Sequence, residues 1–139
     1  RWFNDKILEK MISFSRRIKE GNFSFFSEDY KELLNHITQD SFVYLDPPYE
    51  LTTSSYNDGK RGFKGWNKDL EAELFSVADQ INAMKIPFML SYVVEHKGKI
   101  NQALLDWVDR NNYHIIQLGD IIGISGSRRK EVLIVNYGI

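Results

Sequence analysis

Asp46 is followed by two prolines and an aromatic residue, and this tetrapeptide could recognise a planar ring that carries an amino group. Pro47 and Pro48 have no backbone N–H, so the segment offers mainly acceptors. The Asp46 carboxylate and the Pro47 carbonyl can accept the two N–H groups of an amine, while Tyr49 stacks on the ring. The tetrapeptide therefore predicts a site for an amine-bearing aromatic ring.

The residues before Asp46 indicate how the tetrapeptide is held. Residues 42–45 read Phe-Val-Tyr-Leu, and an acid and two prolines follow at once. This is the pattern of a buried parallel strand that stops at its carboxyl end. Ligands of open α/β sheets bind in the crevice outside the carboxyl ends of the strands. We therefore expect Asp46 and Tyr49 to lie at such a crevice.

The tetrapeptide resembles the catalytic motif of the amino-methyltransferases of DNA, in particular the Dam-like, DpnM-like class of adenine methyltransferases. The resemblance continues in residues 25–30 (Phe-Phe-Ser-Glu-Asp-Tyr) and in residues 125–133 (Ser-Gly-Ser-Arg-Arg-Lys-Glu-Val-Leu), in the family's order. It implies an α/β, Rossmann-like methyltransferase fold that uses S-adenosyl-L-methionine. The expected sheet is mostly parallel and ends in an antiparallel hairpin.

The resemblance also implies an activity and roles for individual residues. The protein would flip an adenine out of double-stranded DNA and methylate its exocyclic amine, within a restriction-modification system that includes a cognate restriction endonuclease. Asp46, Pro47 and Tyr49 would be catalytic, and Asp29, Tyr30 and Asp46 would meet the cofactor. An acid that suits a helix amino terminus explains Asp29 about as well.

Two polar segments carry the candidate contacts to DNA. Residues 50–66 form a long loop in which aromatic residues stand among cations and glycines, as in binding loops. Residues 119–130 resemble the family segment that borders the target-base pocket. The candidate substrate-binding residues are Pro48, Lys60, Arg61, Lys64, Ser125, Arg128 and Arg129. A solvated loop and a charged hairpin tip that protects a sheet edge remain as alternative explanations.

Hydrophobic periodicity predicts the elements around the motif. Helices are expected over residues 4–20, after a cap at Ser27, over residues 67–84 and over residues 99–111, where Ile100 would be buried. Strands are expected over residues 23–26, 87–92, 113–118 and 131–136. The helix over residues 4–20 should face a core. The strand over residues 87–92 should run parallel to the motif strand in a right-handed strand–helix–strand unit. It ends at Ser91 and Tyr92, where the family has Ser-Asn.

Composition narrows the class of protein. A chain of 139 residues fits one domain, and its net charge of −1 leaves phosphate contacts to local clusters of cations. Cysteine is absent, which excludes disulfides and thiolate catalysis and agrees with a cytoplasmic location. Three scattered histidines predict no metal site. No apolar run approaches the ~20 residues of a membrane span, so no membrane partner is expected.

The chain begins at Arg1 and lacks the family's Phe-x-Gly-x-Gly cofactor turn. We therefore expect residues 1–139 to be the carboxyl-terminal catalytic part of a methyltransferase domain, inactive alone, with residues 1–20 as a candidate end of the target-recognition region. Two alternatives stay open. One is a non-catalytic DNA-binding or scaffold fragment. The other is a cytosine-amine DNA methyltransferase, although those enzymes usually carry Ser where this chain has Asp46.

Overall fold

The computed structural model describes residues 4–49, 51, 66–122 and 128–138, with the backbone alone at residues 120–122. The chain divides into two compact units, Arg1–Glu32 and Leu33–Ile139. The candidate residues Lys60, Arg61, Lys64 and Ser125 lie outside the described residues. Within the described chain, no helix combines the length and the apolar character that crossing a membrane requires.

The first unit contains the helix α1 (Asp5–Glu20). It begins after Asn4, whose Oδ1 accepts the Ile7 backbone N–H at 3.0 Å, and it ends at Gly21. The prediction of a helix here is confirmed. Its expected burial is wrong for the described chain, because none of its residues is buried and Phe14 is 66% exposed.

Residues 23–26 do not form the expected strand. Phe23, Phe25 and Phe26 are 60–75% exposed. A strand needs a neighbour to pair its backbone groups, and no described segment pairs with this one. A 3-10 helix, η1 (Tyr30–Asn35), follows. Its cap is Asp29 instead of Ser27, since Asp29 Oδ1 accepts the Lys31 backbone N–H at 3.0 Å.

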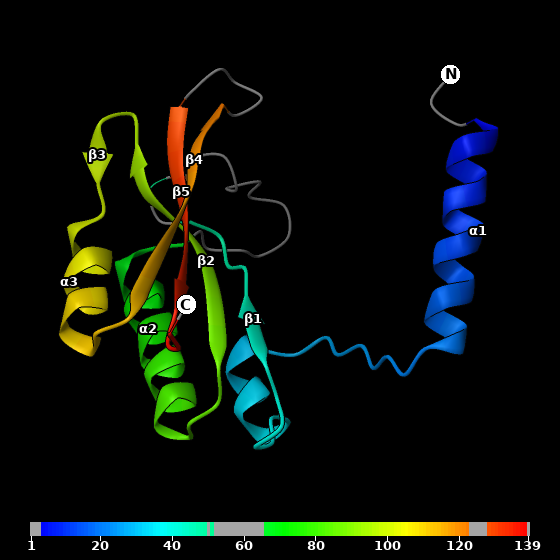
Figure 1. Ribbon diagram of the computed structural model, residues 1–139, viewed down its shortest axis with the longest axis horizontal. Helices are drawn as coiled ribbons and strands as arrows, with labels where there is room; N and C mark the ends of the chain where they lie inside the picture. Colours follow the sequence, from blue (N-terminus) through cyan, green and yellow to red (C-terminus); the bar gives the residue numbers. More distant parts are fainter. Residues whose placement is uncertain (1–3, 50, 52–65, 123–127, 139) are drawn as a thin grey trace. The chain divides into compact units, whose positions relative to one another are not determined.

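The second unit contains a sheet in the order β1-β2-β5-β4 (Figure 1). Its strands are β1 (Val43–Leu45), β2 (Phe88–His96), β3 (Lys99–Ile100), β4 (His114–Ile122) and β5 (Arg128–Val135). β1 pairs in parallel with β2, whereas β2 pairs antiparallel with β3 and β5, and β5 with β4. The expected terminal hairpin is confirmed. The expectation of a mostly parallel sheet is wrong for the described strands, because among their pairings only that of β1 with β2 is parallel.

Two helices pack on β2, namely α2 (Lys68–Ala83) and α3 (Gln102–Asn111). The predicted helix after Asn67 is confirmed, and Asn67 Oδ1 caps it at 3.0 Å. α3 begins later than expected because residues 99–100 pair with β2 as β3 and Asn101 caps the helix. Ile100 is therefore 59% exposed instead of buried.

The core lies between these helices and the sheet. Its largest fully buried side chains include Trp107, Tyr92, Phe88, Leu74 and Ile81. Burying one side chain of this size contributes about 1.5–3 kcal/mol. The apolar faces of α2 and α3 thus hold β2 in place, and with β2 the parallel neighbour β1 that carries the motif.

Candidate active site

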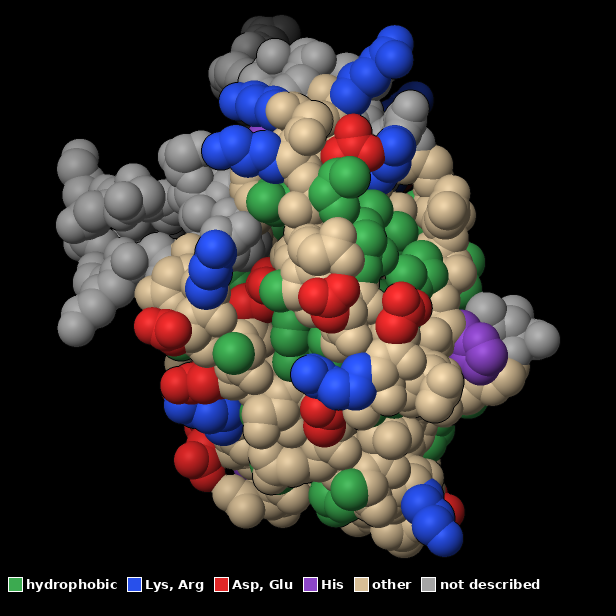
Figure 2. All heavy atoms as spheres, turned by 90° about the vertical axis from the view of Figure 1, so that its left-hand side faces the viewer, with side chains coloured by type: hydrophobic (Ala, Val, Ile, Leu, Met, Phe, Trp, Pro, Cys, Tyr) green, Lys and Arg blue, Asp and Glu red, His purple; other side chains and the backbone are tan. Residues whose placement is uncertain are grey.

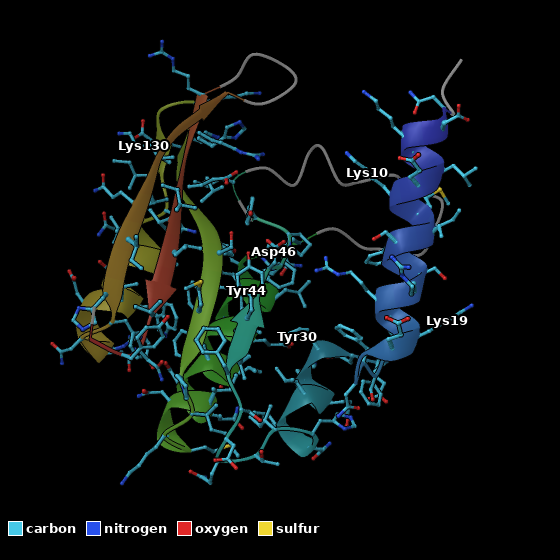
Figure 3. The ribbon with its side chains drawn as sticks, turned by 45° about the vertical axis from the view of Figure 1, so that its right-hand side comes forward. Lys10, Lys19, Tyr30, Tyr44, Asp46 and Lys130 are labelled. Atoms are coloured by element: carbon cyan, nitrogen blue, oxygen red, sulfur yellow. The ribbon has the colours of Figure 1, made fainter. Side chains whose placement is uncertain are left out.

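Asp46 lies directly beyond the carboxyl end of β1 (Figure 3). Val43 and Leu45 are buried at 4% and 7% exposure, whereas Tyr44 between them is 56% exposed, so β1 has one covered face. Leu45 pairs with Leu90, which places Asp46 beside Ser91 at the same edge of the sheet. The expected position of the motif at a strand end is confirmed. The carboxylate of Asp46 is exposed, and Pro47 and Pro48 are half-buried.

Tyr49 turns its hydroxyl back toward Asp46. The hydroxyl donates a long hydrogen bond of 3.4 Å to Asp46 Oδ1 and lies 3.3 Å from Ser91 Oγ. Burial raises the pKa of Tyr49, and the charges of Asp46 and Glu131 add to this, while the Ser91 hydrogen bond and Arg129 act in the opposite direction. The phenol therefore stays protonated at neutral pH and remains a donor to the motif carboxylate.

The ring of Tyr49 is enclosed. It is 9% exposed, and the ring of Tyr92 meets it edge-on with centroids 5.5 Å apart. The Arg129 guanidinium lies 5.9 Å from its centroid and pairs with Glu131 at 2.5 Å. Stacking of a base on Tyr49 stays a prediction, and it requires one of these neighbours to move aside.

The other predicted site residues fall in different places. Arg128 is exposed at the start of β5, and Arg129 lies beside the Tyr49 ring. Their phosphate contacts stay predictions. Asp29 caps η1 and lies 3.9 Å from Lys31 Nζ, and Tyr30 is half-buried. The structure thus shows Asp29 as a helix cap, and the cofactor role of both residues stays a prediction.

A buried carboxylate beside the motif escaped the sequence analysis. Glu71 is 3% exposed, and its Oε2 accepts the Tyr92 hydroxyl at 2.6 Å and Asn101 Nδ2 at 2.8 Å. Trp66 Nε1 donates to Tyr92 Oη at 3.0 Å. The sequence did hold a signal, because Glu71 stands three residues before Leu74 and four before Phe75, on the buried face of α2.

β2 also holds the segments on either side of residues 52–65. His96 Nδ1 lies 2.9 Å from the carbonyl oxygen of Leu51, two residues after the motif. Trp66 is bound to Tyr92 as above. Both described residues that flank this stretch are therefore hydrogen-bonded to the same strand.

A cavity and a mixed distribution of charge (Figure 2) lie near the site. A cavity of about 790 Å³ opens between the starts of α2 and α3 and includes Leu51 and Glu71 in its lining. Figure 2 shows the face that carries α3, where cationic and acidic side chains alternate among the described residues. No cluster of three or more potential metal-ligating His, Asp or Glu side chains occurs in the described part of the chain. The exposed Asp46 residue carries a carboxylate that can accept hydrogen bonds from an amine.

Comparisons with known proteins agree with the motif. The chain is 38% identical over 141 residues to Modification methylase StsI of Streptococcus sanguinis, with 97% of this chain and 22% of that protein covered. It is 37% identical over 139 residues to Type II methyltransferase M.FokI of Planomicrobium okeanokoites, with 97% and 22% covered. It is 36% identical over 140 residues to Modification methylase LlaI of Lactococcus lactis subsp. lactis, with 97% and 21% covered. The chain thus spans about a fifth of the length of these relatives.

A family model gives the same assignment. The model of the D12 class N6 adenine-specific DNA methyltransferases matches residues 1–122, which include the Asp46 tetrapeptide, α2, β2 and α3. The resemblance that the sequence indicated is therefore confirmed over most of its length. The chain belongs to the D12 class of N6 adenine-specific DNA methyltransferases.

Proposed function

We propose that the protein containing this chain transfers a methyl group from S-adenosyl-L-methionine to the exocyclic amine of adenine in DNA, as the modification enzyme of a restriction-modification system. Membership of the D12 class and the printed names of the relatives support this activity. The observation that carries it is the exposed carboxylate of Asp46 at the end of β1, held by the Tyr49 hydroxyl.

Asp46 and Pro47 would act on the amine directly. The amine of adenine is a weak nucleophile because its lone pair is delocalised into the ring. The Asp46 carboxylate and the Pro47 carbonyl would each accept a hydrogen bond from one N–H of the amine. The nitrogen then becomes more tetrahedral, and its lone pair turns toward the methyl donor. The rate then comes from positioning and from charge placement, without a covalent enzyme intermediate.

Tyr49 would keep Asp46 in the orientation that this step requires. Its hydroxyl occupies one acceptor position on Oδ1, and an ionised carboxylate has about four such positions, so others remain for the amine. Because the phenol stays protonated, this contact persists across neutral pH. Bound S-adenosyl-L-methionine supplies the methyl group, and Asp29, Tyr30 and Asp46 are the residues proposed to hold it.

The contacts to DNA belong to the same proposal. Flipping the adenine out of the helix costs about a few kcal/mol, and stacking of the base on Tyr49 would offset part of this cost. Such stacking requires the side chain of Arg129 or Tyr92 to move away from the Tyr49 ring. Pro48 and Arg128 are proposed to contact the substrate, together with the residues outside the described part of the chain. A restriction endonuclease of the same system is the proposed partner.

We also infer that the described sheet is the carboxyl-terminal part of a Rossmann-like methyltransferase fold. The parallel β1–α2–β2 unit with Asp46 at its end and the terminal antiparallel hairpin support this inference. That residues 1–20 mark the end of a target-recognition region stays a prediction.

Mass spectrometry of nucleosides tests the activity. DNA is treated with S-adenosyl-L-methionine and the complete protein that contains this chain, and N6-methyladenine is expected. Asp46→Asn should lower its formation by about a hundredfold or more, since the amide replaces an acceptor with a donor. Asp40→Asn, which removes an exposed acid from the turn before β1, is the matched control and should act as the wild type. Methylcytosine as the product, or no methylated base at all, would contradict the proposal.

A further inference from the structure

We propose that Glu71 is a positioning residue of the methyl-transfer site, which fixes Tyr92 and, through Tyr92, the ring of Tyr49. This inference rests on the proposed function and adds to it a residue 25 positions beyond Asp46 in the sequence. Its basis is a continuous set of contacts from Glu71 through Tyr92 to Tyr49 of the motif, three side chains that are all buried.

Glu71 is a buried carboxylate. Its side chain lies on the covered face of α2 at 3% exposure. Removing a carboxylate from water costs free energy. A well-packed apolar residue at the same place often stabilises a protein at least as much as a buried charge does. Buried polar groups of this kind can instead define one arrangement of their partners. The partners of Glu71 therefore indicate what this residue does.

Tyr92 is held at both its hydroxyl and its ring. Its hydroxyl donates to Glu71 Oε2 at 2.6 Å and accepts from Trp66 Nε1 at 3.0 Å. Its ring is fully buried, with Phe75 at 6.3 Å and Tyr49 at 5.5 Å between centroids. Packing holds the ring and hydrogen bonds hold the hydroxyl, and Glu71 Oε2 makes the shorter of these two hydrogen bonds.

Tyr92 contacts Tyr49, which is hydrogen-bonded to Asp46. The ring of Tyr92 meets that of Tyr49 at an interplanar angle of 72°. Its neighbour in β2, Ser91, lies 3.3 Å from the Tyr49 hydroxyl, which in turn donates to Asp46. Two consecutive residues of β2 thus contact Tyr49, Tyr92 at its ring and Ser91 at its hydroxyl. A shift of Tyr92 would reach the carboxylate that is proposed to accept the amine.

The same helix supplies a matched control. Asp79 on α2 accepts Trp107 Nε1 at 2.9 Å and the Tyr113 hydroxyl at 2.9 Å, again one carboxylate with one tryptophan and one tyrosine. Trp107 stacks on Phe75 at 4.4 Å, so two rings, Phe75 and Tyr92, stand between it and Tyr49. Loss of Asp79 should weaken the core without moving the motif.

The experiment compares steady-state kinetics of four variants of the complete protein that contains this chain. Glu71→Leu removes the acceptor, Glu71→Gln keeps an acceptor oxygen, Tyr92→Phe removes the hydroxyl, and Asp79→Leu is the control. We expect Glu71→Leu and Tyr92→Phe to lower kcat by about tenfold to a hundredfold, with KM for DNA and cofactor nearly unchanged. Glu71→Gln should recover most of the wild-type kcat. Asp79→Leu should keep kcat although its Tm falls.

Other results would overturn the proposal. Wild-type kcat in Tyr92→Phe would do so, and this variant keeps the packed ring, so it decides the matter even if Glu71→Leu does not fold. An equal fall of kcat in Asp79→Leu would show that the effect is general destabilisation. Absence of adenine methylation by the wild type would instead contradict the proposed function, so the two failures are distinguishable.

Discussion

Two carboxylates on one helix, Glu71 and Asp79, hold similar partners at opposite ends of an aromatic row. Each accepts hydrogen bonds at 2.6–2.9 Å, and each has a tyrosine and a tryptophan in its network. The row runs from Tyr49 through Tyr92, Phe75 and Trp107 to Tyr113. Glu71 lies at the end that meets the motif, and Asp79 lies at the other. Similar hydrogen bonds can therefore position the motif residues at the Glu71 end and stabilise the core at the Asp79 end.

The largest effect on stability is expected at the Asp79 end. Trp107 is 1% exposed, stacks on Phe75 and donates to Asp79, so Trp107→Ala opens a cavity and removes a donor. The free energy of unfolding should fall by about 3–5 kcal/mol. Urea denaturation followed by circular dichroism measures this value. A loss below about 1 kcal/mol would contradict the assignment of Trp107 to the core.

The same substitution at both carboxylates should have similar effects on stability. Glu71→Leu and Asp79→Leu each leave buried donors without their acceptor, so each should lower the free energy of unfolding by about 1–3 kcal/mol for every such donor. Thermal denaturation should show similar losses of stability in the two variants, whereas only Glu71→Leu should have a lower kcat. This result would show that the effect of Glu71 on kcat is not caused by lost stability. If only Glu71→Leu were destabilising, its lower stability would explain its lower kcat. The assignment of a positioning role to Glu71 would then be wrong.

A third and smaller prediction concerns the helix cap that belongs to the Glu71 end alone. Asn101 caps α3 through Oδ1, which accepts the Leu104 backbone N–H at 3.0 Å, and it donates to Glu71 from Nδ2. Asn101→Ala should lower the free energy of unfolding by about 0.5–2 kcal/mol. The double variant with Glu71→Gln should lose less than the sum of the two single variants, because the two residues share a contact. Strict additivity would show that they are independent.

The smallest effect is a pH dependence at the Asp79 end. Burial, followed by the hydrogen bond to Asp79 and its charge, raises the pKa of Tyr113 above its usual value of about 10. The unfolded chain releases this proton first, so the free energy of unfolding is at its full value below pH 10 and falls as the pH rises further. Tyr113→Phe should flatten this fall in alkaline denaturation. If the pH dependence of the free energy of unfolding were the same in Tyr113→Phe as in the wild type, Tyr113 would not be its cause.

The positions of the motif strand and of α2 could be predicted from sequence, whereas the direction of most other strands could not. Asp46 follows an apolar strand at once, and α2 repeats its apolar residues at three and four positions, so local patterns placed both. The direction of the remaining strands depends on which segments pair across long distances, and no local pattern reports that. The resemblance to the methyltransferase fold predicts a mostly parallel sheet, whereas most pairings of the described strands are antiparallel.

The contacts around the motif were the less predictable part. An arginine near a hairpin tip suggests phosphate binding, but pairing with Glu131 places Arg129 beside Tyr49. A glutamate in the first turn of a helix ordinarily faces water, but Glu71 shares a face with Leu74 and Phe75 and meets donors from β2 and from the α3 cap. Both outcomes depend on partners that are distant in sequence.

The most direct test of the account is a crystal structure of the complete protein with DNA that carries the target adenine and a non-reactive analogue of the cofactor. The account predicts the adenine amine nitrogen at about 2.7–3.2 Å from both the Asp46 carboxylate and the Pro47 carbonyl. It also predicts that Tyr49 still donates to Asp46 and that Glu71 still accepts from Tyr92. An amine bound elsewhere, with Asp46 turned toward solvent, would contradict it.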